Sequence, residues 1–434
     1  MMQIIEIKSQ AEFDAVALDI CRGAGGPDSA SLTDKLTAVQ SIIDAVRERG
    51  DAAVSEFTER FDGVVLSPER FELTGDEILT ARSTVEQPIR EALERAHANI
   101  LHFHKKNLRQ SWEDVAPDGS VLGQRITAIR SVGLYVPGGT AFYPSSVLMN
   151  IVPARVAGVG AIVMVSPPSY NGSIHPLVLT AACIAGATRV FRIGGAQAIA
   201  ALAYGTETIP PVLKIAGPGN IYVTLAKRLV STVCDIDKEA GPSEVVVIAD
   251  EQAEPRRVAI ELLAQAEHDE EARPMLVTTS STLVRQVVLV IEEELKTLPR
   301  AGIIRKSLAA KGRTYIVRDV EEAAKLTSLI APEHLSIQTR NPRAVLEQVP
   351  DVGCAVLGGE TSVAVGDYYA GPNHILPTGG RARFSSPLTA EDFRKVTSVI
   401  SFSPERMKAA ADDIIALANA EGLQAHARAI EIRR

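Results

Sequence analysis

The spacing of the hydrophobic residues changes from a helical to a strand-like pattern near residue 130. Before that point apolar residues recur every three or four positions, as in Leu36, Val39, Ile43 and Val46, and again through 86–105. Such spacing is typical of amphipathic helices, so the first hundred residues are predicted to be mostly helical, with a short helix over 11–21. Helices are also predicted at 391–399 and 404–421, in an Ala-rich tail.

After residue 130, short apolar runs alternate with helical stretches. The runs at 132–136, 161–165, 190–193 and 212–216 each lead into a turn rich in glycine or proline. A second series begins at Ala240, with predicted strands at 245–249, 275–278, 313–317, 334–338 and 355–357. Strands that alternate with helices indicate parallel sheets. The predicted fold class is α/β, with two incomplete Rossmann-like parallel-sheet domains, a helical N-terminal lead-in and a helical C-terminal tail.

The same pattern predicts where the domains begin and end. We expect an N-terminal helical segment at 1–24, a discontinuous α/β domain at 25–130 plus 243–383, a Rossmann-like domain at 131–242 and a helical tail at 384–434. Glycine-rich turns would gather at the carboxyl ends of the strands, where open α/β sheets bind ligands. The usual G-x-G-x-x-G fingerprint is missing, and Gly158-Val-Gly160 precedes a strand, so the residues alone leave open whether the ligand is a dinucleotide.

Composition narrows the class of protein. The chain of 434 residues is 46% hydrophobic and 23% charged, with a net charge of -8 and no basic tract, which argues against nucleic-acid binding. The apolar runs are too short to cross a membrane, and the N-terminus lacks the features of a signal peptide, so we expect a cytoplasmic protein. The cysteines are scattered, which disfavours disulfides and a thiolate zinc site: Cys21, Cys183, Cys234 and Cys354.

Candidate chemistry begins with the loop at 366–380, whose glycines and prolines argue against regular structure. It carries Asp367, Asn373 and His374 among apolar residues and tight turns. A rigid loop that presents an acid and an imidazole is a common way to hold a ligand, although the same residues suit an ordinary surface loop.

The other histidines with acidic neighbours extend this set. Gln265 and His268 are three residues apart on a predicted helix, so both could reach one ion, or they could be ordinary polar residues at a helix end. Glu333 and His334 offer two bases with different pKa values. Near the C-terminus, His426 follows Glu421 by five positions and matters only if the tail packs into a site, including a neighbouring subunit's. His97, His102 and His104 lack nearby carboxylates and are not expected to be ligands.

Several motifs occur together in one order over nearly the whole chain. They are Gly133-Leu-Tyr-Val-Pro-Gly-Gly-Thr, Gly194-Gly-Ala-Gln-Ala-Ile-Ala, Gly217-Pro-Gly-Asn, Gly241-Pro-Ser-Glu, Gln265-Ala-Glu-His-Asp, Ala331-Pro-Glu-His-Leu, Gly366-Asp-Tyr, Gly371-Pro-Asn-His and Glu421-Gly-Leu-Gln-Ala-His-Ala-Arg. In these motifs the chain closely resembles the histidinol dehydrogenase family of histidine biosynthesis. The resemblance implies an NAD-dependent zinc enzyme that oxidises L-histidinol through L-histidinaldehyde to L-histidine, using two NAD+ and one water.

The resemblance also implies roles for single residues. Glu333 and His334 would be the catalytic bases. One Zn2+ per subunit would be held by Gln265, His268, Asp367 and His426. The residues expected to contact the substrate are Ser243, Gln265, His268, His334, Asp367, His374, Glu421 and His426. Those expected to contact NAD are Tyr135, Gln197 and Asn220. The family's subunits form an intertwined homodimer in which the tail completes the partner's site.

The chain departs from the family pattern at two places, and two alternative functions are considered beside the family's. Lys238 and Glu239 stand where a Met usually follows the Asp, and Leu225 replaces an expected acidic residue, which puts local packing in doubt rather than chemistry. One alternative is a related zinc and NAD enzyme acting on another polar alcohol, against which the presence of His374 and Glu421 argues. The other is a non-catalytic α/β binding or scaffold protein, which predicts no metal and no NAD reduction.

Overall fold

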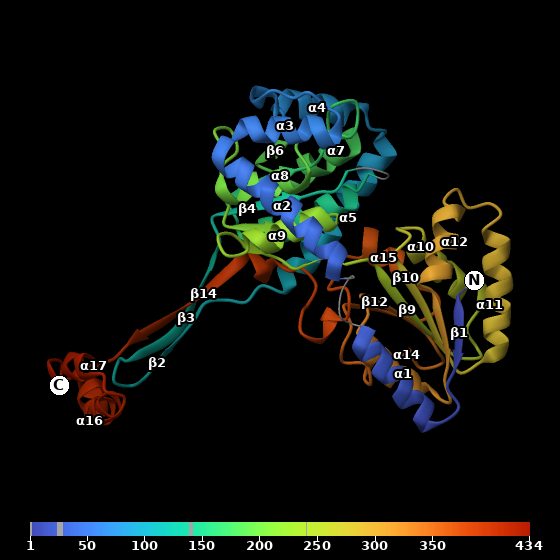
Figure 1. Cartoon of the computed structure of the whole chain (residues 1–434). Coiled ribbons are helices and arrows are strands. Elements are labelled where there is room, and N and C mark those ends of the chain that lie inside the picture. Colours follow the sequence, from blue (N-terminus) through green and yellow to red (C-terminus); the bar gives the residue numbers. More distant parts are fainter. Residues whose placement is uncertain (1, 24–28, 139–141, 240) are drawn as a thin grey trace.

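The computed structural model describes residues 2–23, 29–138, 142–239 and 241–434 and contains two parallel sheets with helices on both faces, as the sequence predicted (Figure 1). A third sheet, antiparallel and not predicted, extends away from them as an arm. No helix in these ranges is long and apolar enough to span a membrane.

The first parallel sheet has six strands in the order β1-β11-β10-β9-β12-β13. Their bounds are β1 Gln3–Glu6, β9 Glu244–Ala249, β10 Arg273–Thr278, β11 Arg313–Ile316, β12 His334–Gln338 and β13 Cys354–Leu357. Val245 and Val247 of β9 face a core with α10 (Pro255–Ala266), α11 (Ser281–Glu294) and α12 (Ala301–Ala310). Val246 and Ile248 face a second core with α1 (Gln10–Gly23), α13 (Val320–Ile330) and α14 (Pro342–Leu346). Burial on both faces explains why β9 is a continuous apolar run.

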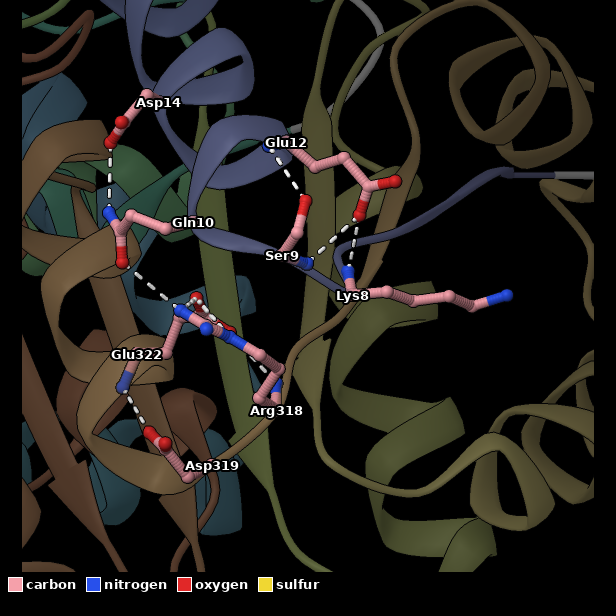
Figure 2. A network of polar contacts seen from close by, with 8 residues as sticks. All are labelled: Lys8, Ser9, Gln10, Glu12, Asp14, Arg318, Asp319 and Glu322. Atoms are coloured by element: carbon pink, nitrogen blue, oxygen red, sulfur yellow. Dashed lines mark hydrogen bonds and ion pairs between the residues drawn. The ribbon is translucent and has the colours of Figure 1, made fainter.

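The N-terminal residues belong to this six-stranded sheet. Strand β1 pairs with β11, and Figure 2 shows the polar contacts that fix the start of α1 beside α13. The Ser9 hydroxyl accepts a hydrogen bond from the Glu12 amide at 3.3 Å, and the Glu12 carboxylate accepts one from the Ser9 amide at 3.1 Å. Arg318 donates to the Gln10 side chain at 3.2 Å. Residues 3–23 are therefore part of the sheet's unit rather than a separate helical segment; the boundary expected between residues 24 and 25 lies outside the described residues.

The second parallel sheet has five strands in the order β6-β5-β4-β7-β8. Their bounds are β4 Ser131–Tyr135, β5 Ala161–Val165, β6 Arg189–Phe191, β7 Lys214–Ala216 and β8 Asp235–Ile236. Four helices connect them: α6 Pro144–Ala157, α7 Pro176–Ala185, α8 Gly195–Tyr204 and α9 Ile221–Val230. Helix α6 is hydrophobic on all sides and almost entirely buried, so its sequence has no amphipathic period and the helix was not predicted.

Helices α2 to α5 cover this five-stranded sheet, which differs from the expected grouping of 25–130 with 243–383. Their bounds are α2 Ser29–Arg49, α3 Asp51–Asp62, α4 Gly75–Thr84 and α5 Gln87–Lys106. Ile43 and Phe57 share a core with Ile199 of α8, and Ile100 shares one with Leu148 of α6. Periodicity predicted the helices at α2 and α5 but did not single out α4, and it could not say which sheet the apolar faces would cover.

The arm consists of β2 (Trp112–Val115), β3 (Val121–Ala128) and β14 (Arg394–Ser401), and it ends in helices α16 (Pro404–Ala420) and α17 (Gln424–Glu431). Strand β14 corrects the helix predicted at 391–399: its Val, Thr and Ile residues favour a strand, and Val396 pairs with Ile126. The Ser403 amide donates to the Ser120 hydroxyl at 2.9 Å and so attaches the start of α16 to the β2–β3 turn. Figure 1 shows the two tail helices at the far end of this arm.

Candidate active site

The predicted catalytic pair lies where β12 begins, beside the start of β9. Glu333 and His334 are both buried. The Glu244 amide donates to Glu333 Oε2 at 2.8 Å, and the Glu244 carbonyl oxygen lies 3.3 Å from His334 Nδ1. Because a carbonyl oxygen only accepts, Nδ1 carries a hydrogen, and in the neutral ring Nε2 is the nitrogen without one and therefore the atom that exchanges protons. One backbone residue thus orients both bases.

His334 also contacts Asp367, whose Oδ1 lies 3.2 Å from Nε2, while Glu333 Oε2 lies 3.6 Å from Nδ1. Burial by itself would lower the pKa of the His334 imidazole, but the carboxylates of Glu333 and Asp367 outweigh burial and hold this pKa well above 6.5. Burial would likewise raise the pKa of Asp367, but the neighbouring imidazoles of His334, His374 and His268 lower it.

Asp367 lies on a short helix, α15 (Val363–Tyr368), although the sequence suggested an irregular loop from 366 onward. The Ser362 hydroxyl caps this helix. The buried Glu261 carboxylate on α10 accepts a hydrogen bond from the Val363 amide at 3.1 Å. Glu261 lies one helical turn before Gln265, on the same face of α10. This face of α10 therefore presents Gln265 and also holds α15, the helix on which Asp367 lies. Glu261 was not recognised from the sequence, where it looks like an ordinary helix residue.

His374 is fixed from two sides. Its Nδ1 lies 2.8 Å from the Asp367 carbonyl oxygen, and its Nε2 lies 3.1 Å from the hydroxyl of Ser146 on α6. Next to it, the Asn373 amide donates to the Met149 carbonyl at 2.7 Å, also on α6. Burial lowers the pKa of His374. The loop therefore joins the two parallel-sheet units, and Ser146 is a contact that sequence reasoning missed because α6 itself was not predicted.

Gln265 and His268 are placed near the end of α10, but not on one helix face as expected. The helix ends at Ala266, so the exposed His268 lies in the turn that follows, where its charge still acts on Asp367. The Gln265 side chain is buried, and its Nε2 has no hydrogen-bond partner among the described residues. Amide, imidazole and carboxylate groups form a nitrogen and oxygen donor set that suits zinc without thiolates. In the described ranges, no group of three or more His, Cys, Asp or Glu side chains lies close enough to hold a metal.

Glu421 and His426 are not brought to this cluster within one chain. Both are exposed, at the end of α16 and on α17, at the far end of the arm from α15 and β12 (Figure 1). A single chain therefore brings at most three of the four predicted metal ligands to one place.

The predicted NAD contacts lie elsewhere, at the carboxyl ends of the five-stranded sheet. The Tyr135 hydroxyl accepts a hydrogen bond from the Gly195 amide at the start of α8, at 3.2 Å. Gln197 is fully buried, and neither atom of its amide group has a partner among the described residues. Asn220 Oδ1 caps α9 by accepting from the Tyr222 and Val223 amides. Helix N-termini and unpartnered polar groups at strand ends fit a dinucleotide.

The two sheets thus present their polar groups at opposite ends. Tyr135 ends β4, whereas His334 begins β12 and Ser243 immediately precedes β9. The residues predicted to contact NAD lie at the carboxyl ends of the five-stranded sheet, whereas Glu333 and His334 lie at the amino end of the six-stranded one, to which α10 returns Gln265. Ser243 is half-buried, and its carbonyl accepts from the Arg273 amide at 2.9 Å.

The departures from the family pattern have local roles. The Glu239 carboxylate pairs with Arg381 at 2.5 Å, and the Lys238 ammonium donates to the Ser386 carbonyl. These contacts join the segment between the two sheets to the 381–386 segment. Leu225 is buried in the core of the five-stranded sheet. None of the three contacts Glu333, His334 or the expected ligands through a hydrogen bond or ion pair in the described residues.

Comparisons with known proteins agree with these features. The family model described as histidinol dehydrogenase matches residues 28–434. The chain is 51% identical to histidinol dehydrogenase of Geobacillus kaustophilus over 396 residues, 91% of this chain and 93% of the relative. The fold is similar to the crystal structure of histidinol dehydrogenase from Elizabethkingia anophelis, with a TM-score of 0.93, 32% identity and coverage of 100% of this chain and 98% of that one. This chain belongs to the histidinol dehydrogenase family of oxidoreductases.

Proposed function

We propose that this enzyme oxidises L-histidinol by four electrons, through L-histidinaldehyde to L-histidine, in the last steps of L-histidine biosynthesis, with NAD+ and one Zn2+ per subunit. The observation that carries the proposal is the pair of buried bases, Glu333 and His334, oriented by Glu244 next to Asp367. A zinc ion held by Gln265, His268, Asp367 and a partner's tail histidine would supply a Lewis acid for the substrate's amine and imidazole, and NAD+ would supply the hydride acceptor.

In the first oxidation, His334 takes the proton of the alcohol while the substrate carbon gives up a hydride. The base is the neutral ring of His334, and Nε2 takes the proton because Nδ1 keeps its hydrogen toward the Glu244 carbonyl. The carboxylates that raise the His334 pKa, Glu333 and Asp367, stabilise the imidazolium that forms. This step gives the aldehyde and a protonated His334, and the hydride would pass to NAD+.

In the second oxidation, Glu333 removes a proton from water as the water oxygen adds to the aldehyde carbon. The hydrate anion that results then gives up a second hydride, which a second NAD+ would accept, and its remaining hydroxyl loses a proton to give the carboxylate. Glu333 suits this role because the Glu244 amide donates to its Oε2 and so orients the buried carboxylate. Ser243, His374 and Glu421 would position the substrate, with Glu421 accepting a hydrogen bond from its amine.

The proposed enzyme is an intertwined homodimer. The arm and tail contribute no residues to the four main apolar cores, and they expose large apolar side chains: Trp112, Val115, Leu122, Val396, Ile400 and Leu417. Exposed apolar residues concentrated on one extension support a subunit interface. In this arrangement the partner subunit's tail delivers Glu421 and His426 to the cluster around Asp367, which a chain's own tail does not reach.

Metal analysis and NADH formation test the proposal together. The purified enzyme should contain about one zinc per subunit and form two NADH for each histidinol consumed, with histidine as product. A related enzyme for another polar alcohol would turn over simple diols faster than histidinol, and a scaffold protein would hold no metal and form no NADH. Either of those results would overturn the proposal.

A further inference from the structure

Asp62, the last residue of α3, carries a half-buried carboxylate that makes no side-chain hydrogen bond or ion pair within the described residues. Its Oδ2 is shielded from solvent and has no hydrogen-bond partner among the described residues. A carboxylate at a helix C-terminus faces the negative end of the helix dipole, which disfavours its charge. Burial raises the pKa of Asp62 to about 6. An acid kept where neither water nor the helix stabilises it suggests a ligand that does.

Asp62 lies near two residues that are predicted to contact NAD, Tyr135 and Gln197. Its charge acts on Tyr135, whose pKa is raised to about 12, mainly by burial and further by Asp62. The Tyr135 hydroxyl in turn accepts from the Gly195 amide, two residues before the fully buried Gln197. Phe57 of α3, Tyr135 at the end of β4 and Ala198 of α8 share one buried core, so the ends of these three elements lie together at the carboxyl edge of the five-stranded sheet.

These groups have hydrogen-bonding capacity that the described residues do not use. Asp62 Oδ2 and Gln197 Oε1 are free acceptors, and Gln197 Nε2 is a free donor. The Tyr135 O–H has no acceptor among the described residues. A ligand for this set must both donate and accept, which a sugar diol does. A phosphate only accepts, and its charge would be repelled by Asp62.

We propose that Asp62 accepts a hydrogen bond from a ribose hydroxyl of NAD, and that Asp62, Tyr135 and Gln197 form a ribose pocket. The inference rests on the proposed NAD dependence and adds a cofactor-binding residue to it. In Rossmann-type sites the acid that binds ribose follows the glycine motif within the sheet's own strand–helix units. Here it comes from α3, which precedes the sheet in sequence, and this explains why spacing rules do not find it.

Calorimetric binding to the full-length enzyme tests the proposal without turnover. The probes are NAD+, ADP, which carries the adenosine ribose, and nicotinamide mononucleotide, which carries the other ribose. Asp62→Asn should weaken NAD+ binding by about tenfold or more, the effect of losing a hydrogen bond to a charged acceptor. The same loss of affinity should appear with only one of the two mononucleotide probes. That probe shows whether Asp62 binds the adenosine ribose or the nicotinamide ribose. Asp62→Ala should give the same result and serves if Asp62→Asn does not fold.

Glu59→Gln is the matched control, since Glu59 is an exposed acid on the same helix, and it should bind NAD+ as the unaltered enzyme does. The inference is wrong if a folded Asp62 variant binds NAD+ within about twofold of the unaltered enzyme, or if Glu59→Gln loses as much affinity. That failure is distinct from failure of the proposed function, in which the unaltered enzyme would form no NADH from histidinol.

Discussion

The hydroxyl of Ser146 lies 3.1 Å from Nε2 of His374, although 228 positions separate the two residues in the chain. Ser146 belongs to α6 of the five-stranded unit, and His374 follows the helix that carries Asp367. Since His374 Nδ1 faces the Asp367 carbonyl, Nε2 must accept the hydrogen that Ser146 donates. The Asp367 carbonyl therefore sets the tautomer of His374, and Ser146 of the five-stranded unit fixes the position of its Nε2.

Replacing Ser146 tests this connection. Ser146→Ala should raise KM for histidinol by about tenfold while changing kcat less, because it removes a hydrogen bond that orients a binding group. Steady-state kinetics with saturating NAD+ measures both constants. Ser41→Ala removes an exposed hydroxyl that donates to the Thr37 carbonyl of its own helix, and it should leave KM unchanged. Equal KM values for Ser146→Ala and the unaltered enzyme would exclude the connection.

Replacing Glu333 separates the two oxidations. Glu333→Gln should still form the first NADH but lower overall conversion to histidine by roughly a hundredfold or more, because no base activates water. Rapid-quench analysis should then find aldehyde accumulating. Glu321→Gln changes an exposed acid on α13 and should convert histidinol normally. If Glu333→Gln turned over histidinol to histidine at the normal rate, the role given to Glu333 would be wrong.

A buried ion pair supports the Gly217–Asn220 turn. The Lys227 ammonium pairs with Asp237 and donates to the Gly217 carbonyl at 2.9 Å, and Asp237 accepts from the Gly217 amide at 2.9 Å. Lys227→Met should lower the free energy of unfolding by about 3–5 kcal/mol, because it leaves Asp237 buried without its partner. Adding Asp237→Asn should recover part of that loss in denaturant unfolding.

Arg228→Met is the control for this pair. Arg228 is adjacent in sequence but exposed, and its contact with Glu239 is 3.7 Å long, so its loss should cost less than about 1 kcal/mol. A Lys227→Met enzyme no less stable than Arg228→Met would show that the buried pair does not stabilise this turn.

His104 should make stability depend on pH. It is fully buried in α5, neither ring nitrogen has a hydrogen-bond partner among the described residues, and burial lowers its pKa to about 4. Because the unfolded chain takes up this proton near pH 6.5 and the folded one does not, stability is lost as pH falls from about 6.5 toward 4. By pH 5 the loss from this group is roughly 2 kcal/mol.

Replacing His104 tests that dependence. His104→Leu should reduce the decline in unfolding free energy between pH 7 and pH 5, measured by urea denaturation. His102→Leu alters an exposed residue of the same helix and should keep the normal decline. Identical slopes for His104→Leu and the unaltered enzyme would refute the role of His104.

The alternation of apolar runs with amphipathic stretches predicted both parallel sheets, because the burial of each strand or helix determines the spacing of its own apolar residues. Strands such as β9 and β12 are buried on both faces and read as apolar runs. Helix α6 was missed for the same reason, since full burial removes its periodicity. Strand β14 was mistaken for a helix because its partner, β3, lies more than 250 residues earlier, and no local signal reports such pairing.

Some residues of the candidate active site could be predicted from the sequence and others could not. Motifs identified Glu333, His334 and Asp367, and the structure brings these three together. Glu261 and Ser146 act through contacts between helices, and Glu244 acts through its backbone although it ends the Gly241-Pro-Ser-Glu motif, so the roles of all three depend on the tertiary fold. Neither the sequence nor the structure of one chain brings His426 to this site, because its expected position there depends on a second subunit.

The central claim is that each active site combines Asp367 of one subunit with the partner's tail. A purified heterodimer of one Asp367→Ala chain and one His426→Ala chain tests it directly, with activity and bound zinc as readouts. We predict that both variant homodimers are inactive, while the heterodimer holds about one zinc per dimer and has about half the normal activity, since one of its two sites is intact. A heterodimer as inactive and as poor in zinc as the two homodimers would contradict the account, because sites built within single chains would both be broken.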